Sequence, residues 1–192
     1  MNKKTFDGKI QYYKILLLGG STVGKTCFLE RYVDGNFHPN HMCTIGMEYK
    51  LKDLKLDNGE IIKLQIWDTP GQERIISLIS YYIKVTHCFI LLYNITDKET
   101  LKFLRYVMKK IKEEASENAI IIVAGNFADD ETNRKITKEE GENFAKEFSL
   151  PFFECSGKEN KNINEIFNFL GKKLYETFEG PKIKLENKKI KK

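Results

Sequence analysis

A glycine-rich stretch near the N-terminus, Gly19-Gly20-Ser21-Thr22-Val23-Gly24-Lys25-Thr26, restricts the possible folds of this chain more than any other segment. It fits the pattern G-x-x-x-x-G-K-S/T of phosphate-binding loops. The apolar run at residues 13–18 precedes it and a helical pattern at 27–33 follows it, which is the strand–loop–helix context that the pattern requires. The alternative, a glycine-rich turn with a solvated lysine, does not explain this context. We therefore expect the loop to bind a nucleotide phosphate.

The chemistry of such a loop explains its residue types. Glycines let successive backbone N–H groups converge on phosphate oxygens, and the following helix directs the positive end of its dipole to the same point. Lys25 is expected to reach the β- and γ-phosphates, and the Thr26 hydroxyl to ligate Mg²⁺. The residues expected to contact the nucleotide here are Ser21, Thr22, Val23, Gly24, Lys25, Thr26 and Cys27.

Composition limits the class of protein. The 192 residues suffice for one domain with an ordinary core. The formal net charge is +5, but residues 182–192 alone hold six lysines and one glutamate, so the rest of the chain is close to neutral. We therefore expect no nucleic-acid-binding face. No apolar run approaches the length of a membrane span, and residues 1–4 have neither a signal-peptide core nor a glycine for myristoylation.

The four cysteines, Cys27, Cys43, Cys88 and Cys155, match no zinc or redox spacing. We expect reduced thiols and a cytoplasmic protein.

Apolar periodicity predicts alternating strands and helices. The predicted strands lie at residues 12–18, 47–56, 61–67, 87–93, 119–125 and 152–155. The predicted helices lie at residues 25–34, 74–83, 98–114, 137–148 and 163–178. Asp57-Asn58-Gly59 is a hairpin signal, so the strand before it should be an antiparallel edge strand. The later alternation predicts a parallel sheet with helices on both faces and a ligand at the carboxyl ends of the strands.

Domain organisation follows from the same pattern. Residues 1–10 are polar and are expected to be flexible, residues 11–179 form one domain, and residues 180–192 form a flexible lysine-rich tail.

A second constellation, Trp67-Asp68-Thr69-Pro70-Gly71-Gln72-Glu73, follows the third predicted strand. Asp68 can hold Mg²⁺ through water, and Gly71 can offer its backbone N–H to a γ-phosphate because no Cβ is in the way. With both motifs in register, residues 12–178 resemble the Ras superfamily of small GTPases, and residues 44–50 and 67–74 are most similar to the Rab branch. The resemblance implies an α/β small G domain of the phosphate-loop NTPase class. Its six-stranded sheet would be mostly parallel, with one antiparallel edge strand and helices on both faces.

The resemblance also implies roles for two switch segments. Thr44 would lie in switch I and sense the γ-phosphate through its N–H and Mg²⁺ through its hydroxyl. Gln72 would lie in switch II and orient the attacking water, as the corresponding glutamine does in Ras. Mg²⁺ would be held by Thr26, Thr44 and Asp68.

Two further loops resemble the base-reading segments of the family. Asn126-Phe127-Ala128-Asp129 matches Asn-Lys-x-Asp, and Cys155-Ser156-Gly157-Lys158 matches the second base-reading loop. Asp129 would accept hydrogen bonds from guanine N1–H and N2, and the Gly157 N–H would meet guanine O6. Adenine satisfies neither contact, and each unpaired buried polar group costs about 1–3 kcal/mol. Phe37 falls where an aromatic ring covers the base edge-on, so GTP and GDP are the expected ligands.

Several positions depart from the family pattern. Phe127 replaces a lysine that braces the ribose and the phosphate loop, and its ring could stack on the base or turn into a local apolar cluster with Phe153 or Phe144. Pro70 stands where alanine is usual, and Thr22 stands where glycine is common. His41 stands where switch I is often aromatic. The chain ends in Ile190-Lys191-Lys192, without the C-terminal cysteines that Rabs usually prenylate.

Together these features favour a guanine-nucleotide switch with slow intrinsic hydrolysis of GTP, acting as Rabs do in vesicle trafficking. Two alternatives are a GTPase-shaped binding module that holds nucleotide weakly or permanently, and an ATP-using kinase or ATPase, which would not explain Asp129 and Ser156. The resemblance implies an exchange factor, a GTPase-activating protein and an effector that bind the two switches. We expect a monomer, cytoplasmic or peripheral on endomembranes, whose basic tail makes weak contact with anionic membranes.

Overall fold

A computed structural model describes residues 12–38, 44, 46–71 and 76–179 of the chain. These residues form a six-stranded sheet in the order β2-β3-β1-β4-β5-β6, in which only β2 is antiparallel to its neighbour. The strands are β1 (Tyr13–Leu18), β2 (Glu48–Lys55), β3 (Ile61–Asp68), β4 (Cys88–Asn94), β5 (Ile120–Asn126) and β6 (Phe152–Glu154). The predicted α/β sheet with one antiparallel edge strand is confirmed.

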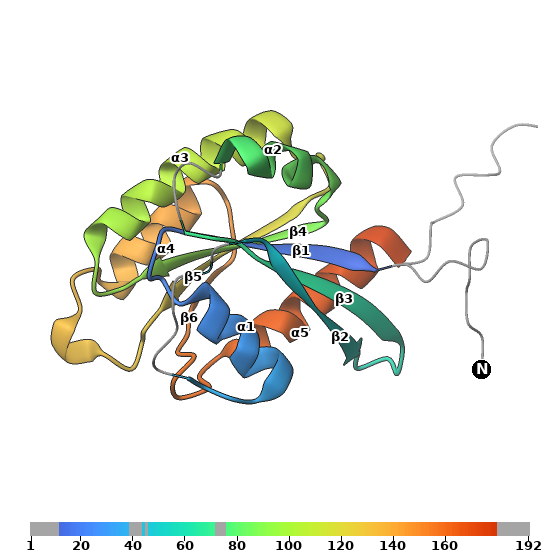
Figure 1. The fold of residues 1–192 in the computed structure, drawn as a ribbon, viewed down its shortest axis with the longest axis horizontal. Coiled ribbons are helices and arrows are strands. Elements are labelled where there is room, and N and C mark those ends of the chain that lie inside the picture. The colour runs from blue at the N-terminus through green and yellow to red at the C-terminus, as the bar shows by residue number, and fades with distance from the viewer. Residues whose placement is uncertain (1–11, 39–43, 45, 72–75, 180–192) are drawn as a thin grey trace, which may run out of the picture.

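Five α-helices lie on the two faces of the sheet: α1 (Lys25–Asp34), α2 (Ile76–Val85), α3 (Lys98–Glu114), α4 (Lys138–Glu147) and α5 (Ile163–Leu174). The helices α2, α3 and α4 cover one face, and α1 and α5 cover the other (Figure 1). Two apolar clusters of buried side chains fill the spaces between these three layers. Among the described residues, no helix is long and apolar enough to cross a membrane.

Local signals explain where the helices begin and end. Gly35, at φ 72°, ends α1 in the left-handed conformation that glycine favours. The predicted capping box begins α4, because the Thr137 hydroxyl accepts from the Glu140 N–H and the Glu140 carboxylate accepts from the Thr137 N–H. The predicted α-helix at residues 163–178 was too long. The helix α5 ends at Leu174, and the chain continues in a π-helical turn, Tyr175–Glu179. A short 3₁₀ helix, η2 (Glu131–Asn133), was not predicted.

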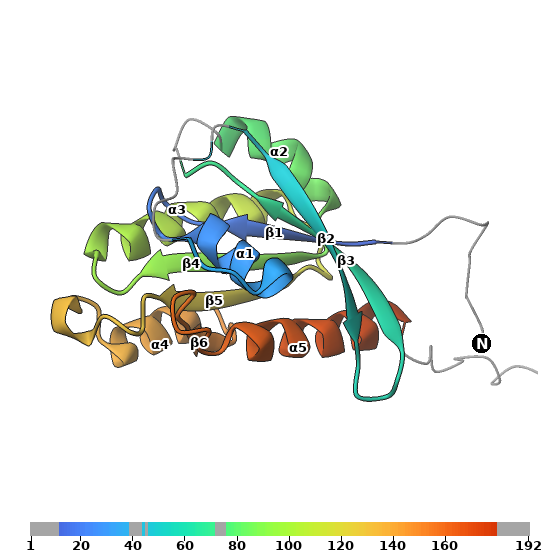
Figure 2. The same cartoon turned by 60° about the horizontal axis from the view of Figure 1, so that its bottom comes forward.

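Most predicted boundaries differ from the observed ones by one or two residues. The predicted start of α2 at residue 74 lies outside the described residues, as do the two terminal segments, and α2 ends two residues later than predicted, at Val85. The sheet places the carboxyl ends of β1, β3, β4, β5 and β6 at one end of the domain, where the loops with the predicted site residues lie (Figure 2). The start of β1 and the end of α5 lie at the opposite end.

A small aromatic cluster at that opposite end joins β1 to the last described turn. The Tyr13 hydroxyl donates to Glu179 Oε1 at 2.6 Å, and the His87 ring packs edge-on against both Tyr13 and Phe178. The Lys14 N–H donates to His87 Nδ1 at 3.0 Å, so this ring nitrogen carries no proton. Burial, aided by the Lys14 charge, lowers the pKa of His87 below its usual 6.5.

This cluster predicts a loss of stability in mild acid. Because the folded pKa of His87 is lowered, the unfolded chain binds the proton first as pH falls below about 6.5. The free energy of unfolding contributed by neutral His87 is therefore complete above that pH and is lost as pH falls through the folded pKa. We expect urea unfolding at pH 7.5 and 5.5 to show this decrease in the native protein and a smaller one in His87→Asn, whose amide oxygen can still accept from Lys14. Equal decreases in the two proteins would contradict this assignment.

Candidate functional site: the loops at the carboxyl end of the sheet

The phosphate loop leaves β1 and enters α1 through two residues in the left-handed region of backbone space. Gly24 has φ 81°, and a Cβ there would lie 2.7 Å from Asn126 Nδ2. Thr22 has φ 61°, which is unusual for a β-branched residue and places strain of the order of 1–2 kcal/mol in the loop. The Thr22 hydroxyl donates to the Ser21 carbonyl at 2.7 Å. The loop therefore keeps its curled conformation although position 22 holds a threonine where glycine is common.

Lys25 lies inside this curl. Its side chain is buried, and Nζ donates to the carbonyls of Gly19 at 3.0 Å and Gly20 at 2.8 Å. Burial lowers the pKa of Lys25 to about 8, and the nearby charge of Asp68 opposes this shift. The ammonium group is thus held within the loop in surroundings where a nearby anion would favour its charged form.

Three side-chain oxygens predicted to bind a metal converge beside the lysine. Thr26 Oγ1 lies 2.6 Å from Asp68 Oδ2 and 2.9 Å from Thr44 Oγ1, and Thr44 Oγ1 lies 3.3 Å from Asp68 Oδ2. The structure therefore brings together residues from α1, β3 and the segment before β2. Carboxylate and hydroxyl oxygens are the ligands that Mg²⁺ prefers.

One oxygen of the Asp68 carboxylate can accept a further contact at this point. Its Oδ1 is buried and has no hydrogen-bond partner within the part of the chain that the structure describes. Burial raises the pKa of Asp68, while hydrogen bonds from Thr26 and Thr44 and the charge of Lys25 act in the opposite direction. An additional cation would satisfy the orphaned oxygen, so this donor set fits Mg²⁺. The described residues contain no group of three or more His, Cys, Asp and Glu side chains that could hold a metal, so a cation here would also need oxygens from water or phosphate.

The segment after Asp68 is fixed against the phosphate loop. The buried Thr69 hydroxyl donates to the Leu17 carbonyl at 2.7 Å. A Cβ at Gly71 would lie 2.4 Å from Ser21 Cα, so only glycine fits this approach. Gln72, the predicted water-orienting residue, lies outside the described residues, as do His41 and Cys43.

Asn126 joins the two base-reading loops to the phosphate loop. It is buried, and its Nδ2 donates to the Val23 carbonyl at 2.9 Å. Its Oδ1 accepts a long hydrogen bond from the Gly157 N–H at 3.4 Å and lies 3.8 Å from Cys155 Sγ. The Gly157 N–H that was predicted to meet guanine O6 is thus directed toward Asn126.

Asp129 is fixed by the second base-reading loop. Ser156 Oγ donates to Asp129 Oδ1 at 2.5 Å, and Lys158 Nζ lies 3.7 Å from Oδ2. The Ala128 N–H donates to the Cys155 carbonyl at 3.0 Å. The side chain of Asp129 is 8% exposed, so its orientation is set by these partners and not by solvent.

Phe127 lies against the phosphate loop. Its backbone has φ 68°, and its Cε2 and Cζ atoms lie 3.4 Å from the position that a Cβ on Gly24 would take. The ring is partly buried and also packs against the apolar cluster that contains Phe144. It therefore occupies the space between loop and core, and stacking of this ring on the base stays a prediction.

Arg31, in the last turn of α1, is a site residue that the sequence analysis missed. Its Nε donates to the Gly157 carbonyl at 2.7 Å and Nη2 donates to the Lys158 carbonyl at 3.1 Å. Its guanidinium also lies 5.7 Å from the centre of the Phe37 ring. Arg31 thus links Phe37 to the second base-reading loop, more than 120 residues away along the chain. Sequence offers only a cation in the last turn of a helix, which is common.

The three described cysteines are not paired with one another. Cys27, Cys88 and Cys155 are free thiols, and burial raises the pKa of each. They are therefore poor nucleophiles.

Comparison with known proteins agrees with this architecture. Residues 14–176 match the Ras family. The chain is 40% identical to the Ras-related protein SEC4 of Saccharomyces cerevisiae over 95% of its own length and 82% of that protein. It is 39% identical to the Ras-related protein Rab-13 of Mesocricetus auratus (84% and 79% covered) and 38% identical to the GTP-binding protein ypt2 of Schizosaccharomyces pombe (91% and 85% covered). The chain therefore belongs to the Ras family of GTPases and, within it, to the Rab branch.

Proposed function

We propose that this Rab-branch GTPase, a GTP-dependent switch in vesicle trafficking, holds GTP or GDP with Mg²⁺ in the loops at the carboxyl end of its sheet. The observation that carries the proposal is the convergence of Thr26, Thr44 and Asp68 beside the buried Lys25. Thr44 comes from the segment that would serve as switch I, so its contact with the other two gives a direct physical route from nucleotide state to switch position.

Each group has a role that its surroundings support. Lys25 would compensate the charge of the β- and γ-phosphates, and backbone N–H groups of residues 21–27 would bind their oxygens. Thr26, Thr44 and Asp68 would hold Mg²⁺, which would supply positive charge to offset the negative charge of the phosphates. The Gly71 N–H would contact the γ-phosphate, because its approach to Ser21 leaves no room for a side chain. Loss of the γ-phosphate would then release both switch segments.

The base would be selected by the second group of loops. Asp129, held by Ser156 and Lys158, would accept from N1–H and N2 of guanine. Asn126 and Gly157 would line the O6 edge, while Phe127 and Phe37 would cover the ring. An adenine base would leave at least two of these buried groups unpaired, at about 1–3 kcal/mol each.

Hydrolysis would require help from a partner. Gln72 would orient the attacking water, and no covalent intermediate is needed. The phosphate loop and residues 36–45 contain no arginine, so the positive charge that stabilises the transition state would come from a GTPase-activating protein. An exchange factor and effectors would bind the two switches in turn.

The rival interpretation is a GTPase-shaped binding module, which is suggested by the departures from the family pattern at Phe127 and Pro70. Both residues are accommodated without loss of the predicted donor set: Pro70 is buried beside Thr69, and Phe127 packs against Gly24. Membership of a family of GTPases also favours the switch.

The remaining parts of the proposal concern the whole chain. The protein would act as a monomer, cytoplasmic or peripheral on endomembranes. Its domain would span residues 11–179, and the lysines of residues 180–192 would make weak electrostatic contact with anionic lipids.

The switch is tested by chromatography of the extracted nucleotide and single-turnover hydrolysis of GTP. We expect guanine nucleotide in the purified protein and slow turnover. Gln72→Leu should keep GTP binding but lose most of the activator's effect, which reaches about 10⁵-fold in related GTPases. Gln65→Leu, at a half-buried position of β3, is the matched control for intrinsic hydrolysis. An unchanged stimulated rate in Gln72→Leu would reject the proposed role, and extracted adenine nucleotide would reject the guanine site.

The placement of Phe127 against Gly24 predicts the effect of restoring lysine. Phe127→Lys should slow release of fluorescent GDP about tenfold, if one charge-assisted hydrogen bond worth about 1.5 kcal/mol is regained. Because the ring also packs against the apolar cluster, the melting temperature of the variant should fall slightly. Unchanged release with a lower melting temperature would mean that the residue contributes packing alone.

The tail should behave as a single weak membrane signal. Binding of the unmodified chain to vesicles with anionic lipid should be reversible and should fall as salt rises, at up to about 1 kcal/mol per lysine near the surface. Removal of residues 182–192 should abolish it. Salt-resistant binding would point to an apolar anchor instead.

A further inference from the structure

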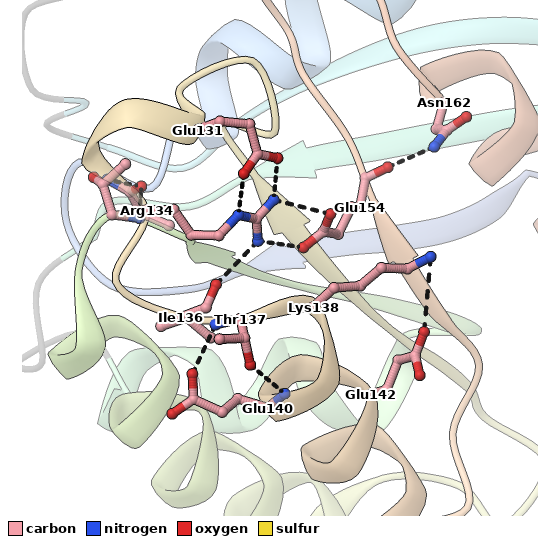
Figure 3. A network of polar contacts seen from close by, with 11 residues as sticks. Glu131, Arg134, Ile136, Thr137, Lys138, Glu140, Glu142, Glu154 and Asn162 are labelled. Atoms are coloured by element: carbon pink, nitrogen blue, oxygen red, sulfur yellow. Dashed lines mark hydrogen bonds and ion pairs between the residues drawn. The ribbon is translucent and has the colours of Figure 1, made fainter.

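One side chain outside the predicted site connects the two chain segments that carry the base-reading loops. Arg134 lies five residues after Asp129, in the segment between η2 and α4. Its Nη1 donates to Glu154 Oε1 at 2.7 Å and Nη2 donates to Glu154 Oε2 at 3.1 Å. Its Nε donates to Glu131 Oε2 at 2.6 Å and Nη2 donates to Glu131 Oε1 at 2.7 Å. The last N–H of Nη1 donates to the Ile136 carbonyl at 3.0 Å, and Figure 3 shows this arrangement.

All five N–H donors of the guanidinium are therefore used. Two parallel hydrogen bonds to a carboxylate fix both distance and orientation, which a lysine cannot do. The carboxylates raise the pKa of Arg134 further above its usual range, and Arg134 lowers the pKa of Glu131. The group is thus charged at every pH at which the protein is folded.

The two carboxylates differ in exposure. The side chains of Arg134 and Glu154 are 15% and 11% exposed, whereas Glu131 is 65% exposed. Exposed pairs contribute little to stability, but removing one member of a shielded pair leaves an uncompensated charge. The contact that matters is therefore Arg134 with Glu154, and Glu131 mainly completes the orientation of the guanidinium.

Glu154 is the last residue of β6 and directly precedes the second base-reading loop. Its carbonyl accepts from Asn162 Nδ2 at 2.6 Å, so the strand end is held on both sides. On the other side, the N–H groups of Lys135 and Ile136 both donate to the Ile95 carbonyl at 2.9 Å, which anchors Arg134 to the chain beyond β4. A closed ring of contacts results: Asp129 leads through η2 to Arg134, then to Glu154 and Ser156, and back to Asp129.

We propose that Arg134 is a positioning residue for guanine recognition, which sets the separation between the segment that carries Asp129 and the loop that carries Ser156. It touches no nucleotide and acts through Glu154. A carboxylate must be oriented well to accept from N1–H and N2 together, and Ser156 can orient Asp129 only when the two loops keep their spacing. The proposal rests on the proposed guanine site.

The test compares release of GDP and IDP, since hypoxanthine keeps N1–H and O6 but lacks the N2 amino group. The paired variant Arg134→Met with Glu154→Gln removes both shielded charges and leaves only the exposed Glu131 without its partner. Arg134→Lys keeps the charge but loses the fork. We expect GDP release from the paired variant to be about tenfold faster, equivalent to about 1.4 kcal/mol. IDP release should change much less, so that the preference for GDP falls, with Arg134→Lys intermediate.

Arg105→Met is the matched control. Arg105 also pairs with a glutamate, through Nη1 and both carboxylate oxygens of Glu147, but this exposed pair joins α3 to α4 and touches neither base-reading loop. Its GDP-to-IDP preference should match that of the native protein. Glu131→Gln should have only a small effect, because it removes the exposed half of the arrangement.

Each outcome decides one point. An unchanged GDP-to-IDP preference in the paired variant and in Arg134→Lys, whatever their melting temperatures, would overturn the positioning role and leave Arg134 with a structural one. If the native protein itself failed to prefer GDP to IDP, the assignment of Asp129, and with it the proposed base site, would be wrong. The second failure is visible without any variant, so the two are distinguishable.

Discussion

The buried amide of Asn126 is the contact on which the arrangement of the site depends. Its Nδ2 donates to the carbonyl of Val23 in the phosphate loop, and its Oδ1 faces the Gly157 N–H of the second base-reading loop. A single planar group thus joins three loops that leave β1, β5 and β6. An amide can do this because it donates and accepts at one position, and a buried amide with either half unpaired would be costly. The loop proposed to bind the phosphates and the loops proposed to bind the base are therefore held at a fixed separation.

On the phosphate side, the fold keeps two charged side chains away from water. Lys25 is enclosed by the carbonyls of its own loop, and Asp68 has a buried oxygen that finds no partner among the described residues. These are unfavourable positions for a lysine and an aspartate considered alone. They would become favourable with phosphates and a divalent cation bound, so the proposed binding would be physically coupled to the order of the neighbouring segments. Thr44, which meets both Thr26 and Asp68, connects this coupling to the segment before β2.

On the base side, the contacts of Arg134 and Glu154 act differently, because they hold the loops in place. Neither Arg134 nor Glu154 needs to touch the ligand, and all five N–H donors of the guanidinium are satisfied within the protein. Arg31 acts from the other direction, holding the carbonyls of Gly157 and Lys158 from the end of α1. The loop at residues 155–158 is thereby held from two sides, which suits the base-reading role proposed for it.

Much of the fold and most of the site follow from local pattern. Backbone conformation restricts the residue types in the phosphate loop, the hairpin and the capping box. These short-range features could therefore be predicted from sequence, and so could the single antiparallel edge strand. The last helix was extended too far because apolar spacing continues through Phe178, and spacing alone does not distinguish an α-helical from a π-helical turn.

What the sequence determined by itself was the chemistry available at each loop, because the motifs at residues 19–26, 126–129 and 155–158 carry their residue types in order. What only the tertiary structure decided was how these loops are held. Arg31 and Arg134 are ordinary surface-type residues in the sequence, and their partners lie 126 and 20 positions away. Phe127 likewise has two plausible placements in sequence and takes a position between Gly24 and the core. Long-range pairs of this kind depend on which strand ends the sheet brings together. The local periodicity of the sequence therefore does not predict them.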